Sequence, residues 1–424
     1  MTAGIIRTTK LALFSVAVAA SAFVAPTSTW AATNNQGMQL VPATFVNNSG
    51  IDAQVYVAII GNSGSETLGT FQFYSATGKN GDVRAYTQSS QSTNIGYMLK
   101  LGSNNKTKIM VPQLQSGRMY FSLYSPLNVT ITRQTYNYPS SKSGPNTGTY
   151  YAIRGPTGWN TADPNYATPY DWVELNWNAG TGPRVLFVNT TQVDMFGLPL
   201  KLTLVSGTTA KSKETVGATP TTWGNVYTAL DQAGSPWTDL IIAPHGHQLE
   251  YLRVISPEHG INTAPYNFPA DQLDSYIGSV FAYYQKNELK ITYNNVPYVG
   301  TTGTVRNQPA IIFNEKNSDA IMKPTTLEVY MNEIPSSAPS GVTDLFAASL
   351  LRSTLLKDST PSDCNTKTYY KYPPVNVYAK VFHRYSIGRL SYAMPYDDTC
   401  NQSTTLSGVP RKLSIVLQPM DIGD

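Results

Sequence analysis

Short strand-like runs, each closed by turn residues, follow one another from residue 39 to about residue 205. Examples are "DAQVYVAIIG" at residues 52–61, "KIMVPQL" at 108–114 and "RMYFSLY" at 118–124. Successive residues of a strand point to opposite faces, so runs of this kind favour sheets with one buried face. Their length and spacing predict a β-sandwich or barrel-like sandwich over residues 39–205.

The segment from residue 206 to 375 has a different pattern, in which strand-like runs alternate with helical ones. The run "ADQLDSYIGSVFAYYQKN" at residues 270–287 has helical spacing of its apolar residues. Its buried face is expected to carry Leu273, Ile277, Val280 and Phe281. We therefore expect a mixed α/β domain over residues 206–375. The late run "KLSIVLQPM" predicts a closing strand of the first domain, which would then combine residues 39–205 with 376–424.

Residues 1–31 are typical of a secretory signal peptide. Arg7 and Lys10 precede the apolar run "LALFSVAVAASAFVA", which is too short for a comfortable membrane span. The residues "TWA" at 29–31 offer a small-x-small cleavage site, so the mature chain is expected to begin near Ala32. No later run is long and apolar enough to span a bilayer. We expect a secreted, soluble protein with no membrane partner.

The composition favours a neutral polar ligand. Charged residues make up only 13% of the chain, which contains 28 tyrosines. The net charge of +4 is spread without long basic runs, and this argues against nucleic acid as a partner. We expect the protein to act as a monomer.

The chain contains two cysteines, Cys364 and Cys400. Cysteines in an exported protein usually form disulfides, so we expect these two to pair. The alternative is two separate buried thiols. Either role is structural, because no histidine or aspartate motif accompanies the cysteines.

Several familiar catalytic motifs are missing from the sequence. It has no G-x-S-x-G elbow, no glycine-rich phosphate loop and no H-E-x-x-H pair. His245 and His247 in "PHGH" are two residues apart, but no third ligand follows at a convincing spacing. His259 and His383 are the other histidines. We expect no metal and no cofactor.

Glu174 is an acid within an alternating run, "WVELNWN" at residues 172–178. In a strand, Val173, Leu175 and Trp177 would face the core. Glu174 would then share the opposite face with the amides of residues 176 and 178. Such a polar stripe suits sugar hydroxyls and a catalytic carboxyl group, but it is also what an ordinary exposed strand face looks like.

Asp194 ends the next strand-like run, "RVLFVNTTQVD" at residues 184–194. If this run lies antiparallel to the first, staggered by one or two residues, the carboxyl groups of Glu174 and Asp194 would be several ångströms apart. This is the layout of a glycoside hydrolase pair, in which one acid protonates the leaving oxygen and the other activates water. Strict alternation puts Thr191 opposite Asp194, so the backbone must be irregular if both face a ligand.

Several runs, taken together, resemble glycoside hydrolase family 64, the β-1,3-glucanases related to plant thaumatin-like proteins. These runs are "GRMYFSL", "VELNWN", "LFVNTTQVDMFGLPLKL", "MKPTTLEVY" and "YAMPYDDTCNQSTTLS". The resemblance implies a mainly β fold: a thaumatin-like β-sandwich or barrel domain and a mixed α/β domain that flank a wide groove. It also implies endo-type hydrolysis of a β-1,3-glucan polysaccharide or oligosaccharide, with inversion at the anomeric carbon.

The resemblance also implies the roles of individual residues. Glu174 matches the family's general acid, and Asp194 matches its general base. The substrate-binding positions would be Asn176, Asn178, Phe187 and Thr191. The gap of 20 residues between the two acids is longer than the family pattern, and "AGTGPR" at 179–184 has the character of an insert.

Two other functions fit the same residues. A non-catalytic thaumatin-like protein would grip glucan without cleaving it, whereas a cell-surface adhesion protein would predict repeats or an anchor. For the enzyme we expect Glu174 to lie in drier surroundings than Asp194, with Trp172 and Trp177 nearby. Asp171 is the next candidate for the acid.

Overall fold

The computed structural model describes residues 32–33, 38–62, 73–77, 82–86, 92–93, 106–138, 146–177, 184–207, 211–244, 246 and 249–421. The predicted signal peptide over residues 1–31 therefore lies outside the described residues. The same holds for Asn178, His245 and His247.

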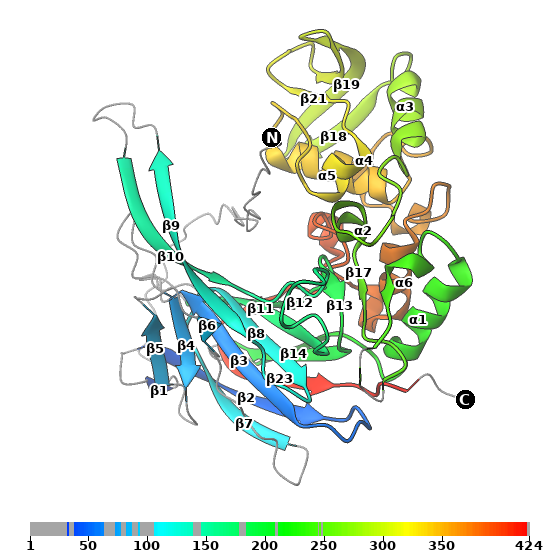
Figure 1. The fold of residues 1–424 in the computed structure, drawn as a ribbon. Coiled ribbons are helices and arrows are strands. Elements are labelled where there is room, and N and C mark those ends of the chain that lie inside the picture. Colours follow the sequence, from blue (N-terminus) through cyan, green and yellow to red (C-terminus); the bar gives the residue numbers. More distant parts are fainter. Residues whose placement is uncertain are drawn as a thin grey trace, which may run out of the picture. The chain divides into compact units, whose positions relative to one another are not determined.

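One large sheet contains six strands and joins the two ends of the described chain (Figure 1). In spatial order the strands are β1 (Ala32–Thr33), β2 (Gln39–Asn47), β23 (Pro410–Leu417), β14 (Leu200–Ser206) and β15 (Ser212–Gly217), while β7 (Lys106–Pro112) also pairs with β2. Strand β23 runs parallel to β2, with Ile415 opposite Phe45, and antiparallel to β14. The late run "KLSIVLQPM" thus returns to the first sheet as a closing strand, as predicted.

The other large sheet has seven strands, all paired antiparallel. In order they are β22 (Leu406–Gly408), β12 (Leu186–Thr190), β11 (Tyr170–Trp177), β8 (Gln115–Leu123), β3 (Val55–Asn62), β4 (Phe73–Thr77) and β5 (Asp82–Tyr86). Phe45 of the six-stranded sheet stacks on Phe121 of this one, with ring centroids 4.7 Å apart. The inward residues of both sheets therefore share one core, and the prediction of a mainly β sandwich is confirmed.

Three smaller sheets are also found among the described residues. The first consists of β10 (Asn146–Arg154), β9 (Val129–Tyr138) and β6 (Ser92–Thr93). The second consists of β13 (Met195–Phe196), β17 (Arg253–Ile255) and β16 (Ile241–Ile242). The third consists of β18 (Leu289–Tyr293), β19 (Val296–Val305), β20 (Gln308–Phe313) and β21 (Ala320–Met322).

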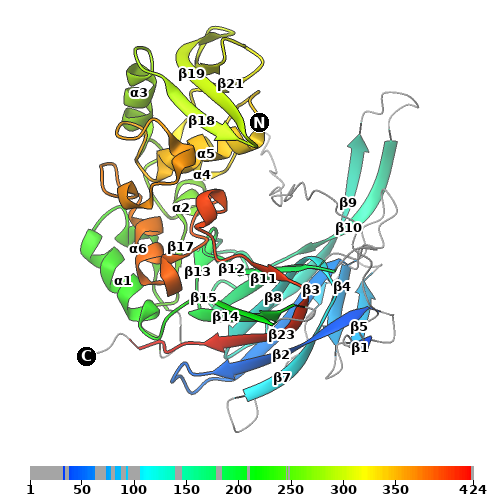
Figure 2. The ribbon, with the colours of Figure 1, turned by 180° about the vertical axis from the view of Figure 1, so that it is seen from behind.

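The helices come from the later part of the chain and gather away from the long strands (Figures 1 and 2). They are α1 (Thr222–Ala233), α2 (Pro257–Asn262), α3 (Asp274–Tyr283), α4 (Thr326–Tyr330), α5 (Ser340–Leu351) and α6 (Val377–Tyr385). Short 3₁₀ turns are η1 (Thr238–Leu240), η2 (Pro361–Asp363), η3 (Thr366–Thr368), η4 (Ile387–Arg389) and η5 (Thr399–Asn401). The four apolar residues predicted to form the buried face of the helix at 270–287 are all buried on or next to α3, so that prediction is confirmed.

Phe196 anchors the helices to the sheets. Its ring contacts Trp223 and Tyr227 of α1 and Phe382 of α6, with centroids 5.7, 6.2 and 5.1 Å away. Strand β13, which carries Phe196, follows Asp194 directly. The chain next to this acid is therefore held on its helical side by an aromatic cluster.

The predicted domain boundaries stay a prediction. Residues Ala31–Asp424 form one compact unit. Helix α6, which lies within the segment assigned to the β domain, packs on α1 of the mixed segment. The predicted disulfide is present, since Cys364 and Cys400 are bonded with Cα atoms 5.4 Å apart. In the described part of the chain no helix has the length and apolar character needed to cross a membrane.

Candidate active site

Glu174 lies near the middle of β11, and the predicted alternation around it is confirmed. Val173, Leu175 and Trp177 are buried, whereas Glu174 is half-buried on the other face. Directly opposite Glu174 are Arg118 on β8 and Asn189 on β12. Directly opposed residues share a face, so these three polar residues form one row across three strands.

Asp194 is not on a strand, and this corrects the predicted stagger of two paired strands. Strand β12 does lie antiparallel to β11, but it ends at Thr190 and the acid follows in a turn. The carbonyl oxygen of Asp194 accepts a hydrogen bond from Ser256 N at 2.9 Å, and Met195 pairs with Ile255. The turn thus carries Asp194 off the sheet and places its backbone beside the start of α2.

Arg118 joins the two candidate acids. Its Nη2 lies 3.2 Å from Glu174 Oε1 and 3.8 Å from Asp194 Oδ2. Because one nitrogen makes both contacts, the two oxygens are at most the sum of these distances apart, about 7 Å. The guanidinium also lies 4.8 Å from the centre of the Trp172 ring, whose Nε1 donates to Glu174 Oε1 at 3.3 Å. The structure therefore brings both acids into one site.

His259 contacts the other oxygen of Asp194. The distance between His259 Nε2 and Asp194 Oδ1 is 3.3 Å. The imidazole is buried and stacks on Trp159, with centroids 3.7 Å apart and planes 9° from parallel. Its position in α2 is fixed by an N-terminal cap, since Ser256 Oγ accepts from the backbone N–H of residue 259 and Pro257 opens the helix.

The surroundings keep Asp194 ionised. Burial opposes its charge, but the hydrogen bond from His259 and the positive charges of His259 and Arg118 outweigh burial and hold the pKa of Asp194 below its usual value. Burial raises the pKa of the neighbouring Glu258, and the charge of Asp194 adds to this rise. Asp194 is thus held in its ionised form, which is the form from which a general base must start.

Comparison with known proteins bears on what such a site is for. The sequence model of the family described as β-1,3-glucanase, glycoside hydrolase family 64, matches residues 39–417. The chain belongs to this family. Two similar relatives are glucan endo-1,3-β-glucosidases, one from Arthrobacter sp. (strain YCWD3) and one from Cellulosimicrobium cellulans. Each is 28% identical over 274 residues, which is 62% of this chain and 48% of the relative. The match thus spans about half the length of these relatives.

Solved structures of family 64 proteins share the fold. A laminaripentaose-producing β-1,3-glucanase in complex with laminaritetraose aligns with a TM-score of 0.74 at 23% identity, over 90% of this chain and 99% of that one. A family 64 domain from Clostridium beijerinckii aligns with a TM-score of 0.67 at 24% identity, over 89% and 98% of the two chains. The resemblance read from the sequence motifs, and the fold that it implies, are confirmed.

The substrate-binding positions implied by the family pattern have different surroundings. Asn176 and Phe187 are half-buried and lie opposite each other on β11 and β12. Thr191 is buried, and its hydroxyl oxygen accepts from Val193 N at 3.3 Å within the turn that leads to Asp194. In a regular strand Thr191 and Asp194 would point to opposite faces. The turn between them breaks the strand geometry, as their facing one ligand would require.

The expectation that Glu174 lies in drier surroundings than Asp194 is wrong. The Glu174 side chain is 28% exposed and that of Asp194 is 20% exposed. Trp172 does share the face of Glu174, but Trp177 points to the opposite face and donates to the carbonyl oxygen of Arg184 at 3.0 Å. Only one of the two tryptophans therefore shields the acid.

Asp171 is a structural residue and not a second candidate for the acid. It is buried, and its carboxylate accepts hydrogen bonds from the backbone N–H groups of Trp172, Gly197 and Leu198. Burial raises its pKa to about 7, while these N–H groups limit the rise. Its side chain fastens β11 to the turn that follows β13.

Sequence reasoning missed Arg118 and His259, because neither stands in a local pattern that points to an acid far along the chain. The remaining described histidine, His383, belongs to a buried network in which Asp397 contacts both His383 and Arg352, at 3.1 and 3.2 Å. Within the described residues no cluster of three or more metal-ligating side chains is found.

Proposed function

We propose that this chain is a secreted glycoside hydrolase that cleaves β-1,3-glucan internally, with Glu174 as general acid and Asp194 as general base. The observation that carries the proposal is the pair of carboxylates bridged by Arg118, in a chain of the β-1,3-glucanase family. A protein that only binds glucan has no need for two acids in contact with one arginine.

The proposed reaction uses the two acids on opposite sides of the anomeric carbon. The glycosidic C–O bond breaks, and the leaving oxygen takes the proton of Glu174. A water molecule forms the new C–O bond and gives a proton to Asp194. The lowered pKa of Asp194 supports its role as the base, because a base must be ionised at the start.

Arg118 and His259 act in this proposal as positioning residues. His259 holds Oδ1 of Asp194 from the buried side, so Oδ2 is left on the side of Arg118 and Glu174. Oδ2 is then the oxygen that faces the water. A ring stacked on Trp159 and held in a capped helix offers little freedom to move, which favours a fixed orientation of the base.

Inversion is part of the proposal and rests on the family resemblance. Inverting acids are about 6.5–9.5 Å apart, and retaining pairs about 5–5.5 Å. The limit of about 7 Å set by the two Arg118 contacts includes the retaining distance and the short end of the inverting range, so the separation does not decide between them.

The test is incubation of the purified protein with laminarin and with curdlan, followed by separation of the products over time. Internal cleavage predicts a rapid fall in average chain length, with oligosaccharides as early products. Binding without any cleavage would favour the glucan-binding alternative. Secretion is tested separately, by recovering the protein from culture medium and sequencing its N-terminus, which we expect near Ala32.

A further inference from the structure

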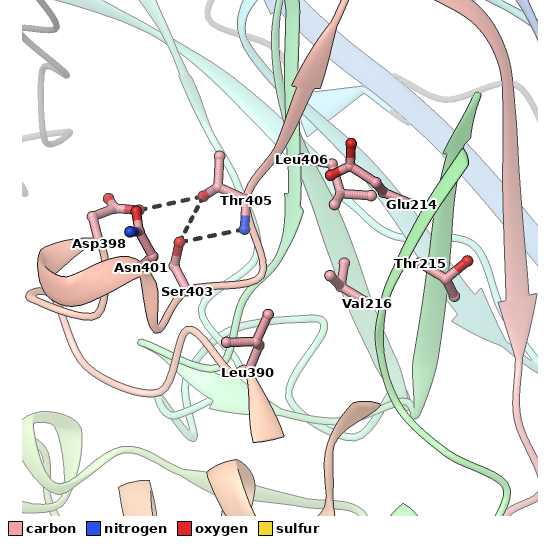
Figure 3. Close-up of a pocket in the computed structure, with 9 residues that line it drawn as sticks. All are labelled: Glu214, Thr215, Val216, Leu390, Asp398, Asn401, Ser403, Thr405 and Leu406. Atoms are coloured by element: carbon pink, nitrogen blue, oxygen red, sulfur yellow. Dashed lines mark hydrogen bonds between the residues drawn. The ribbon is translucent and has the colours of Figure 1, made fainter. Parts of the chain in front are cut away.

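A cavity of about 460 Å³ lies between β22, the last strand of the seven-stranded sheet, and β15, the last strand of the six-stranded sheet (Figure 3). Asp398, Asn401, Ser403 and Thr405 line one side of it, and Glu214 of β15 lies across from them. Cavities of 300–1,000 Å³ are typical of small-ligand sites. The volume therefore suits a small polar group such as one sugar unit.

The cavity lies two strands away from the strand that carries Glu174. The strand order is β11, β12, β22, and Leu406 of β22, which lines the cavity, is directly opposite Val188 of β12. Two strand spacings separate β11 from β22, about 10 Å. Strands β22 and β15 are each the last of their sheet, so the cavity opens where the two sheets end.

Tyr392 connects the cavity to the acids through its own contacts. Its carbonyl oxygen accepts from Gln192 N at 2.8 Å, two residues before Asp194. Its hydroxyl donates to Asp398 Oδ2, on the cavity wall, at 2.7 Å. Burial, the Asp398 carboxylate and, more weakly, the Glu174 carboxylate raise the pKa of Tyr392. Tyr392 thus links the segment before Asp194, through its backbone carbonyl, to the cavity wall, through its hydroxyl.

The lining has the chemistry of a site for a neutral, hydroxyl-rich ligand. Ser403 Oγ donates to Thr405 Oγ1 at 3.1 Å, and Thr405 Oγ1 donates to Asp398 Oδ1 at 3.3 Å, as Figure 3 shows. Val216, Leu390 and Leu406 add an apolar surface. The described residues that line the cavity include carboxylates and no lysine, arginine or histidine, so an anionic ligand would find no counter-charge among them.

The wall that carries these groups is braced by the disulfide. Cys400, bonded to Cys364, stands between Asp398 and Asn401 in η5. Cys400 and Asn401 have φ of 62° and 53°, a left-handed conformation that asparagine tolerates better than most residues. The polar groups are therefore presented by a cross-linked turn.

We propose that this cavity is a distal subsite that binds one glucosyl unit of a β-1,3-glucan chain running from Glu174 across β12 and β22. The proposal rests on the proposed function, because it assumes that glucan occupies the site of the two acids. It assigns the recognition of longer chains to Asn401 and Glu214, which have free access to solvent.

The test compares a cavity variant with a matched control. The cavity variant is Asn401→Gly with Glu214→Gln, which keeps the left-handed backbone at 401 and removes the amide and one charge. The control is Asn307→Gly with Glu315→Gln, which makes the same changes at exposed residues with φ of 63° and 59° in turns of the four-stranded sheet. Melting temperatures check that both fold.

Binding of laminarihexaose and laminaritriose is measured by calorimetry, with every protein also carrying Glu174→Gln to suppress cleavage. The cavity variant should lose about tenfold in affinity for the hexaose, because the hydrogen bond to Asn401 is lost and the one to residue 214 loses its charge, while the control does not change. The ratio of hexaose to triose affinity should fall by the same factor.

The outcomes separate this proposal from the proposed function. Equal hexaose affinity in the cavity variant and the control overturns the subsite, whereas cleavage of laminarin by the unmodified enzyme upholds the function. A loss confined to the cavity variant, together with no cleavage by the unmodified protein, supports the subsite and overturns the function. Failure of every protein to bind the hexaose overturns the subsite.

Discussion

Replacing His259 with phenylalanine should leave Asp194 in place but remove the contact that orients its carboxylate and holds its pKa down. The substitution keeps a flat ring that can stack on Trp159, and it deletes the N–H that faces Asp194 Oδ1 at 3.3 Å. The backbone N–H of residue 259 still reaches Ser256 Oγ, so the start of α2 keeps its cap. The change therefore isolates the contact between imidazole and carboxylate.

The size of the effect follows from the geometry. Hydrogen bonds to charged groups contribute about 1.5–3 kcal/mol. This one is long, and the Asp194 side chain is 20% exposed, so the lower end applies. A loss of about 1.4 kcal/mol in transition-state stabilisation is a tenfold fall in kcat/KM. We expect a fall of about tenfold on laminarin near the pH optimum.

The pH profile gives a sharper readout than the rate. Asp194 must be ionised to act as base, and His259 helps to hold its pKa down. Without the imidazole the pKa of Asp194 rises, so activity is lost at a higher pH on the acidic side of the profile. The loss relative to the unmodified enzyme should be greatest at low pH and should shrink as the pH rises and Asp194 ionises.

The assay is kcat/KM against pH for the unmodified enzyme, His259→Phe and His259→Gln. Glutamine retains a side-chain N–H and should restore part of the activity and part of the acidic limb. An acidic limb that stays in place in His259→Phe, with the rate reduced equally at every pH, would refute the role of His259 as the partner of the base.

Three further changes test other parts of the mechanism and the fold. Glu174→Gln should keep the fold and glucan binding but lose about 10²–10⁴-fold in turnover, and more than about a third of the activity remaining would place the acid elsewhere. Arg118→Met removes the bridge between the acids and one positive charge beside Asp194, so the acidic limb of kcat/KM should move to higher pH; an unmoved limb would contradict the bridge. Reduction of the Cys364–Cys400 bond, which spans 36 residues, should lower stability by on the order of 3–4 kcal/mol, and an unchanged melting temperature on adding reductant would contradict it.

The elements that were predictable are those whose signal is local. The alternation in "WVELNWN" determines which residues of β11 are buried, because a strand offers only two faces. The helical spacing in residues 270–287 likewise determines the buried face of α3. In both cases a periodic pattern of a few residues was enough to predict which side chains are buried.

The site was predictable only in part, because its contacts join distant segments. His259 and Asp194 are 65 residues apart in the sequence, and the pairing of β13 with β17 brings them together. The position of Asp194 beyond the strand depends on a turn whose backbone bonds to Ser256. No local sequence pattern predicts that turn. The prediction from alternation therefore placed Asp194 on the strand.

Stereochemistry at the anomeric carbon tests the roles of the two acids most directly. Laminarin is cleaved at high enzyme concentration, and the first-formed reducing ends are followed by proton NMR before they mutarotate. If Asp194 acts as a base on water and Glu174 as the acid, the α-anomer appears first. If the β-anomer appears first, the reaction proceeds with retention, Asp194 acts as a nucleophile, and its assignment as the general base is wrong.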